Sequence, residues 1–234
     1  MTELYKSQAP QRRAYIQTVI NSTSENYMFL YNNLAPEVFC PELVRVGTTN
    51  DGGKWICSPF RIPSQCKVVS LGLYNEVTFE RELQYITNSR CSIYGYDTNE
   101  QSPKTKEILG KIRTKTRKAT ISKTTDETRN MYTLDYLMKL ESISELELLK
   151  ADVEGAEFEI IPPFLLEYTP AQIMVEIHGT PYDTATLLRL ISNQGYWLYS
   201  HEINGAWHTL CEFSFIHESA FTRYGATPMA RYLN

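Results

Sequence analysis

A dense group of carboxylates follows an apolar run in the second half of the chain. Asp152, Glu154 and Glu157 lie within six residues, around the glycine at position 155. Acidic residues weakly favour the start of a helix, which accounts for Glu157. Asp152 instead ends a segment of buried character, where an unpaired carboxylate is costly. We therefore expect it to meet a partner, a metal or a ligand.

A histidine, His178, ends the next apolar run, QIMVEIH. Most isolated histidines are structural, but an imidazole beside Asp152 would be able to act as a general base with a pKa near neutrality. We therefore expect Asp152 and His178 to be the catalytic residues. The other three histidines show no metal-ligand spacing and are interpreted as structural.

Two further positions have the spacing of a nucleoside-binding site. Gly72 ends the run VVSLG and allows a sharp turn that presents backbone amides to a ligand. Asp97 ends the next apolar run 25 residues later, where a carboxylate accepts hydrogen bonds from ribose hydroxyls. A single glycine is not a three-glycine fingerprint, and a solvent-facing acid that ends a strand fits the spacing equally well.

These residues fall at the ends of strands in an alternation of strands and helices. We expect strands at 68–72, 91–97, 147–153 and 172–178, and helices at 76–86, 134–140, 156–166 and 183–194. Such repeats predict an α/β fold with a mostly parallel sheet covered on both faces. Ligands bind at the carboxyl ends of such strands, which is where the candidate acids lie.

The remaining segments are less regular. We expect two short helices within 1–40, a loop or hairpin at 45–55, a short helix near Ile108, a strand near 119–122, and strands at 196–200 and 210–216. The last two strands form an antiparallel hairpin through Asn204-Gly205, which adds one reversed strand at the end of the sheet. The predicted domains are a helical N-terminal extension, 1–40, and a main domain, 41–234.

Composition narrows the function classes. The chain has 234 residues, 42% of them hydrophobic, and a net charge of -4, so we expect a folded protein that binds neither nucleic acid nor anionic membranes. It has no apolar stretch of the roughly 18 residues that span a bilayer. Neither does its N-terminus contain the apolar core of a signal peptide, so we expect a cytoplasmic protein.

The number and spacing of the cysteines also favour a cytoplasmic protein. The five cysteines, at positions 40, 57, 66, 91 and 211, are widely spaced and contain no CxxC pair. This pattern predicts mostly reduced thiols and no zinc site. The sequon Asn21-Ser22-Thr23 is weak evidence for a secretory protein and matters only if a leader has been removed.

Five segments together carry a family resemblance. They are DGGKW (51–55), VVSLGLYNEVTFERELQ (68–84), SIYGYD (92–97), LLKADVEGAEFEII (148–161) and MVEIH (174–178). Across about residues 40–217 the chain resembles the methyltransferase-like domain family related to the FkbM methyltransferases. The resemblance implies a class I S-adenosylmethionine-dependent methyltransferase with a three-layer, Rossmann-like fold. Its seven-stranded sheet would contain a reversed strand in a C-terminal hairpin.

The resemblance also implies roles for individual residues. The cofactor S-adenosylmethionine would be bound by Gly72, Asn75, Asp97, Asp152 and Glu154. The cofactor or substrate would be capped by Asp51, Gly52, Lys54 and Trp55. The first loop departs from the usual methyltransferase pattern, because Tyr74-Asn75-Glu76 replaces small residues.

Methyl transfer to a hydroxyl requires a base, for which Asp152 and His178 are the candidates. The resemblance favours an oxygen acceptor on a small molecule or a glycan. A metal-assisted variant would use Asp152, Glu176 and His178, but we expect no metal. The alternatives are an inactive binding or scaffold domain and, less favoured, a nicotinamide-dependent oxidoreductase, for which the three-glycine fingerprint is missing. The oligomeric state stays open.

Overall fold

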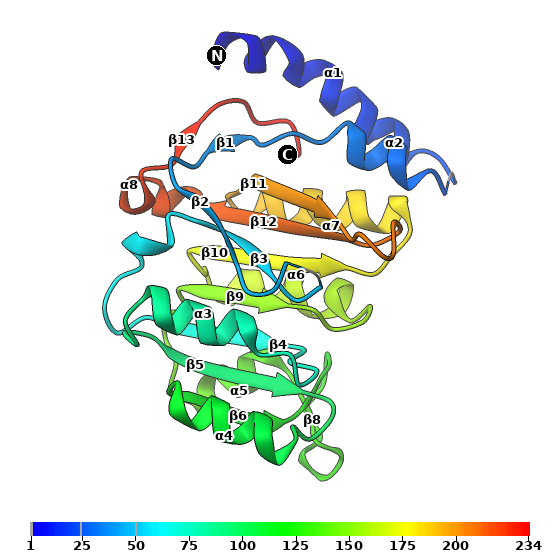
Figure 1. Cartoon of the computed structure of the whole chain (residues 1–234). Coiled ribbons are helices and arrows are strands. Elements are labelled where there is room, and N and C mark those ends of the chain that lie inside the picture. Colours follow the sequence, from blue (N-terminus) through cyan, green and yellow to red (C-terminus); the bar gives the residue numbers. More distant parts are fainter. Residues whose placement is uncertain (1, 24, 50) are drawn as a thin grey trace.

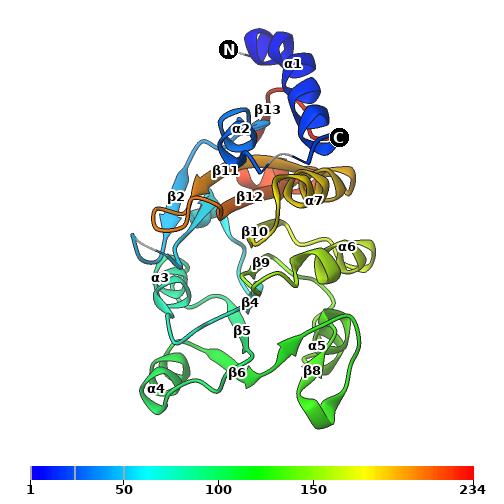
Figure 2. The same cartoon turned by 90° about the vertical axis from the view of Figure 1, so that its right-hand side faces the viewer.

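A seven-stranded sheet forms the centre of the molecule. The computed structural model describes residues 2–23, 25–49 and 51–234, and Figures 1 and 2 show the sheet and the helices around it. In spatial order the strands are β11 (Tyr196–Ile203), β12 (Cys211–His217), β10 (Gln172–Ile177), β9 (Leu148–Ala151), β4 (Lys67–Leu71), β5 (Ser92–Asp97) and β6 (Thr114–Lys118). This sheet confirms the predicted α/β, Rossmann-like fold class.

The reversed strand is β12, which pairs antiparallel with both β10 and β11. The other pairs in the sheet, β10–β9, β9–β4, β4–β5 and β5–β6, are parallel. The C-terminal hairpin is therefore present as expected. Its reversed strand lies one position in from the edge of the sheet, because β11 occupies the edge.

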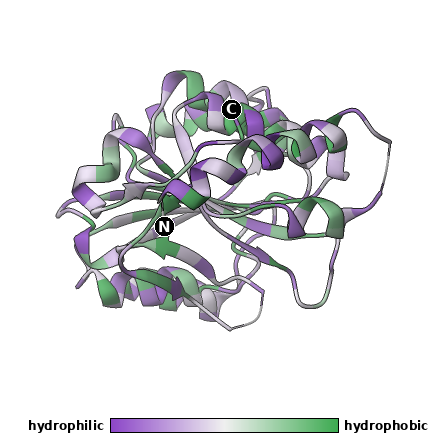
Figure 3. Ribbon diagram, turned by 90° about the horizontal axis from the view of Figure 1, so that it is seen from above, coloured by the Kyte–Doolittle hydropathy of each residue, from purple (hydrophilic) through white to green (hydrophobic). Residues whose placement is uncertain are grey.

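Helices cover both faces of the sheet, which gives three layers (Figures 2 and 3). One face carries α3 (Thr78–Ile86) and α4 (Pro103–Lys111), and the other carries α5 (Leu134–Leu140), α6 (Glu157–Glu167) and α7 (Pro181–Asn193). Every residue of β9 and β10 is buried, since both faces of these strands are covered. Helix α7 begins earlier than expected, because Thr180 caps it and Asp183 completes a capping box.

Two helices lie within the first 40 residues, as predicted, but the first of them is not short. Helix α1 spans Thr2–Ile20, and α2 spans Tyr27–Asn32. Both contribute buried side chains, such as Ile16 and Leu30, to the same hydrophobic core as the sheet. The predicted boundary at residue 40 stays a prediction.

The C-terminal end of the chain returns to this N-terminal region. The buried carboxylate of Glu37 accepts hydrogen bonds from the backbone amides of Leu198, Tyr232 and Leu233. The short elements where the two regions meet are β1 (Val38–Phe39), from the N-terminal region, and α8 (Phe221–Tyr224) and β13 (Thr227–Pro228), from the C-terminal end. Strands β1 and β13 pair with each other.

The segment 45–55 belongs to a hairpin, one of the two expected alternatives. Strands β2 (Leu43–Val46) and β3 (Lys54–Cys57) pair antiparallel, and Asn50 lies outside the described residues. In the polar region 98–132, α4 was expected. Strand β6 was missed, and β7 (Thr120–Ile121) pairs with β8 (Met131–Tyr132). The sequence of β6, TKTRK, has no apolar residue, because this edge strand is largely exposed.

The prediction of mostly reduced cysteines is wrong. Cys40 is disulfide-bonded to Cys57, and Cys66 to Cys91. The fold brings each pair together: Cys66 and Cys91 precede the adjacent parallel strands β4 and β5, with Cα atoms 4.5 Å apart. Spacing along the sequence does not reveal such a contact. Cys211 is unpaired and buried.

Candidate active site

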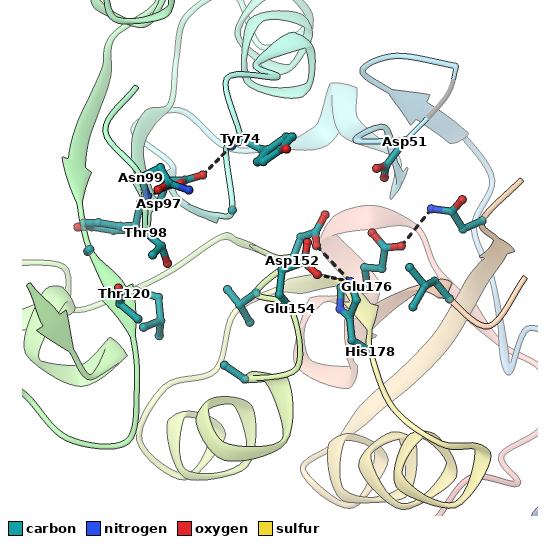
Figure 4. Close-up of a pocket in the computed structure, with 18 of the residues that line it drawn as sticks. Asp51, Tyr74, Asp97, Thr98, Asn99, Thr120, Asp152, Glu154, Glu176 and His178 are labelled. Atoms are coloured by element: carbon teal, nitrogen blue, oxygen red, sulfur yellow. Dashed lines mark hydrogen bonds and ion pairs between the residues drawn. The ribbon is translucent and has the colours of Figure 1, made fainter. Parts of the chain in front are cut away.

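A cavity of about 720 Å³ opens at the carboxyl ends of β4, β5, β9 and β10 (Figure 4). Six of the predicted site residues line it: Asp51, Gly72, Asp97, Asp152, Glu154 and His178. Figure 4 shows Asp97 on one side of the cavity, and Asp152, Glu176 and His178 on the other. They come together because parallel strands end at the same edge of the sheet.

The loop that follows β4 has a left-handed backbone at three positions, although only one of them is a glycine. Gly72 has a φ of +75°, and a Cβ added there would lie 1.9 Å from the carbonyl oxygen of Asp152, so only glycine fits. Tyr74 and Asn75 also have left-handed backbones, with φ of 46° and 60°. Such conformations are strained for residues with side chains, and they persist where surrounding contacts hold them.

Those contacts come from the last residue of β5 and from the segment that follows it. The backbone amide of Tyr74 donates to Asp97 Oδ2 at 2.6 Å, and that of Asn75 donates to Gln101 Oε1 at 2.9 Å. In return, Asn75 Oδ1 accepts a hydrogen bond from the amide of Ser102 at 2.7 Å. The side chain of Asn75 therefore anchors the loop and is not among the residues found to line the cavity.

Asp97 is 7% exposed, and its other oxygen, Oδ1, accepts a hydrogen bond from the amide of Asn99 at 2.6 Å. Two backbone amides thus fix the orientation of this carboxylate at the cavity wall. The wall continues through Tyr96, Ala119 and Ile121, which are buried and apolar or aromatic. A carboxylate beside an apolar surface is suited to a ribose joined to a flat base.

The acidic motif after β9 surrounds His178. Its Nδ1 lies 3.0 Å from Glu157 Oε1, and its Nε2 lies 3.5 Å from Glu154 Oε2 and 3.9 Å from Asp152 Oδ1. Burial alone would lower the pKa of His178, but the hydrogen bond and charge of Glu157, with the charge of Asp152, outweigh it and raise the pKa to about 9. At neutral pH His178 is an imidazolium, which differs from the base expected from the sequence.

A second charged cluster lies beneath the cavity. Lys54 is 1% exposed, and its Nζ contacts Glu212 Oε1 and lies 3.8 Å from Asp152 Oδ2. Burial alone would lower the pKa of Lys54, but Glu212 and Asp152 outweigh it and raise the pKa. Lys54 therefore pairs with Asp152 and is not among the residues found to line the cavity.

Glu176 was considered from the sequence only as a metal ligand. It is 2% exposed, lines the cavity, and lies opposite Glu212 in the β10–β12 register. Burial, followed by the charges of Glu212 and Asp152, raises the pKa of Glu176 to about 8. Asn204 Nδ2 donates to Glu176 Oε1 at 3.2 Å.

Two other predicted capping residues, Trp55 and Gly52, are not among those found to line the cavity. Trp55 donates through Nε1 to Glu202, which also accepts from Arg45 Nε at 2.9 Å. Gly52, with a φ of +99°, faces the side chain of Glu76. Of the four residues predicted to cap the site, only Asp51 is found among those that line the cavity.

The sequence pattern does not show which side chains face a cavity, so several lining residues were missed, both in expected strands, such as 91–97 and the one near 119–122, and in loops. They are Tyr96, Thr98, Asn99, Ala119, Thr120, Ile121, Val153, Ala156, Asn204, Trp207 and Leu210. The Asn204-Gly205 turn was a usable signal, since a hairpin that ends at this edge of the sheet must bring its tip near the site. Among the described residues, two groups have metal-ligand spacing: Asp152, Glu154 and His178, and Asp51, Asp152, Glu176 and Glu212. Lys54 already contacts the second group. The expectation of no metal stays a prediction.

The raised pKa values predict a pH-dependent stability. The folded pKa of His178 is about 9 against 6.5, and that of Glu176 is about 8 against 4.5. A raised folded pKa gives stability that is present below the unfolded value and lost as the pH rises through the folded value. The free energy of unfolding should therefore fall between about pH 5 and pH 9, by roughly 2–5 kcal/mol.

Urea unfolding at several pH values measures this effect. In the Glu176→Gln variant the free energy of unfolding should vary less with pH between about pH 5 and pH 8, because glutamine does not ionise. Glu107→Gln, at an exposed position, should leave this pH dependence unchanged. Equal stability of the wild-type protein at pH 5 and pH 9 would contradict the assignment.

No described helix is both long and apolar enough to cross a membrane.

Comparisons with known proteins bear on the family to which this chain belongs. The profile of a family described as a methyltransferase domain matches residues 3–217. No curated protein matches the chain significantly.

Two solved structures illustrate the similarity. Precorrin-6y C5,15-methyltransferase from Geobacter metallireducens GS-15 is 13% identical, with a TM-score of 0.44 over 68% of this chain and 83% of that chain. A SAM-dependent methyltransferase from Aquifex aeolicus is 9% identical, with a TM-score of 0.40 over 67% of this chain and 84% of that one. The predicted cofactor, S-adenosylmethionine, is the one that the name of the second structure gives for that protein. On the match over residues 3–217, the chain belongs to the methyltransferase domain family.

Proposed function

We propose that this protein transfers a methyl group from S-adenosylmethionine to a hydroxyl oxygen of a small molecule or a sugar, as its resemblance to FkbM methyltransferases suggested. The observation that carries the proposal is the arrangement of Asp97 and Asp152 on opposite sides of one cavity (Figure 4). One carboxylate is placed for a cofactor ribose, and the other for a reacting hydroxyl.

The residues present fit the cofactor. Asp97 would accept hydrogen bonds from the ribose hydroxyls, and Ala119 and Ile121 offer an apolar surface for the adenine. Gly72 lets the chain approach closely, and Asp152 and Glu154 place negative charge near a sulfonium. The bound cofactor supplies an already electrophilic methyl group.

The chain's own residues orient the acceptor and take its proton. Asp152 faces the cavity and is flanked by two cations, Lys54 and the imidazolium of His178. These cations hold the carboxylate in place near the acceptor. We assign Asp152 as the group that receives the hydroxyl proton, and His178 as the residue that positions it.

The cavity lining suits a hydroxyl-rich acceptor. Tyr74 and Trp207 line the cavity and are 83% and 68% exposed, so their rings are free to stack against the apolar faces of a sugar. Carboxylates between them accept hydrogen bonds from hydroxyls. The same acidic lining repels phosphate groups, which supports the expectation that nucleic acid is not a partner.

Thermal unfolding with added ligand tests the proposal at the cofactor. S-adenosylmethionine or S-adenosylhomocysteine at 100 times its Kd should stabilise the protein by about 2.7 kcal/mol and raise Tm by roughly 5–10 °C, whereas NAD should not. Asp97→Ala should abolish the shift, because it removes the ribose acceptor and releases the amide of Tyr74. Asp135→Ala, on α5, is the matched control and should keep it.

A second step tests the acceptor, by screening hydroxylated compounds, sugars among them, for methyl transfer. If the wild-type protein shows no shift with either adenosyl ligand, the alternative of a scaffold domain without cofactor affinity replaces the proposal. If the Tm shift is present and only amines or carbon acids are methylated, the proposal that the methyl group goes to an oxygen atom is wrong.

A further inference from the structure

The two disulfides are structural, not part of the reaction. Cys66 and Cys91 precede β4 and β5, at the amino edge of the sheet, whereas the cavity lies at the carboxyl edge. Cys40 and Cys57 close a 17-residue separation around the β2–β3 hairpin. All four side chains are buried, which keeps them away from small redox partners.

Structural disulfides of this kind indicate where the chain folds. They form and persist in oxidising compartments and are rare where glutathione keeps thiols reduced. The unpaired Cys211 is buried on β12, and burial raises the pKa of its thiol well above the usual range. A buried, protonated thiol does not attack disulfides, so the two pairs are protected from exchange.

The sequon Asn21-Ser22-Thr23 is placed where a glycan can be attached. It follows the last residue of α1, and both Asn21 and Thr23 are exposed. Asn21 Oδ1 accepts a hydrogen bond from Gln17 Nε2 at 2.9 Å, on the surface of the helix. Residues 21–23 are not among those found to line the cavity, so a glycan there leaves the site open.

We propose that this chain folds in an oxidising secretory compartment, and that Asn21 carries an N-linked glycan there. In the transfer, Asn21 Nδ2 forms a bond to the anomeric carbon of an oligosaccharide. The bond from that carbon to a lipid diphosphate breaks, the diphosphate leaves, and Nδ2 loses one proton. The sequence contains no other Asn-x-Ser/Thr triplet, so a single glycan is expected.

The test is secretion of the full chain from a eukaryotic cell behind a cleavable leader. Treatment with peptide N-glycosidase should lower the apparent mass in one step and convert Asn21 to aspartate, which peptide mass spectrometry locates. Asn21→Gln and Thr23→Ala should remove the step, and Thr23→Ser should keep it. Asn193→Gln, at the exposed end of α7, is the matched control and should also keep it.

Peptide mapping of the same secreted protein without reductant tests the compartment. Cys40 should be found linked to Cys57, and Cys66 to Cys91. Expression in a reducing cytosol should give a protein with a lower Tm, since the unfolded chain without its two disulfides is less constrained. A secreted, disulfide-bonded protein without a glycan would overturn the modification. Free thiols in the secreted protein, or equal stability with and without reduction, would overturn the compartment.

Discussion

Lys54→Met should destabilise the protein by about 3–5 kcal/mol, enough to unfold a large fraction of it. Methionine keeps the volume and apolar stem of lysine but removes the charge that Glu212 and Asp152 share. Glu176 also lies next to these carboxylates, so the substitution leaves a buried group of acids in which Glu212 has lost the cation that it contacts. Breaking such a cluster costs more than an exposed ion pair contributes.

Chemical unfolding of the variant measures this cost. Lys139→Met is the matched control, because Lys139 pairs with Asp135 on the exposed side of α5 and should change stability by less than about 1 kcal/mol. The double variant Lys54→Met/Glu212→Gln should recover part of the loss, since it removes one stranded charge. A cost for Lys54→Met as small as the control's would show that the buried cluster is not held by this lysine.

The central strands were predictable because burial on both faces leaves a simple signal in the sequence. Strands β9 and β10 contain nearly continuous apolar runs, and the expected ranges differ from the observed ones by two residues or fewer at each end. Strand β6 gives no such signal, since its Lys, Thr and Arg side chains lie at the edge of the sheet. Hydrophobic pattern alone finds the interior of a parallel sheet and misses its polar edge.

The position of Asp97, Asp152 and His178 at one edge of the sheet was predictable from the topology. Each ends, or directly follows, a strand of one parallel sheet, so its position in the sequence places it at one edge. The role of Lys54 was not predictable in this way. It lies 158 residues from its partner Glu212, and the direction of its side chain depends on how the β2–β3 hairpin packs against β12.

The first loop and the cysteines illustrate two other limits. The sequence Tyr74-Asn75 argues against a glycine-like turn, yet hydrogen bonds hold both residues in left-handed conformations: Asp97 and Gln101 accept from their backbone amides, and the Ser102 amide donates to Asn75. Disulfide pairing likewise depends on which strands are neighbours. The spacing of the cysteines does not show that β4 and β5 are neighbours in the sheet. Tertiary contacts therefore determine both the conformation of the loop and the pairing of the cysteines.

The largest effect on activity is expected from Asp152→Asn. Asparagine has the shape of aspartate but cannot receive the proton of a hydroxyl acceptor, so methyl transfer should fall by about 10²–10⁴-fold. Binding of S-adenosylhomocysteine should change little, because this ligand has no sulfonium charge for Asp152 to stabilise, and Asp97 and the loop around Gly72 are untouched. The ratio of these two effects separates a role in proton transfer from a role in binding.

Single-turnover methylation of an acceptor identified in the screen measures the chemical step, and the Tm shift with S-adenosylhomocysteine measures binding. Asp135→Asn, on α5, is the matched control, because Asp135 is not among the residues found to line the cavity. If Asp152→Asn keeps its rate while Glu176→Gln loses it, the proton goes to Glu176, which faces the same cavity. Because Glu176 has a pKa of about 8, such an enzyme would need alkaline pH for full activity, whereas proton transfer to Asp152 requires no ionisation of Glu176.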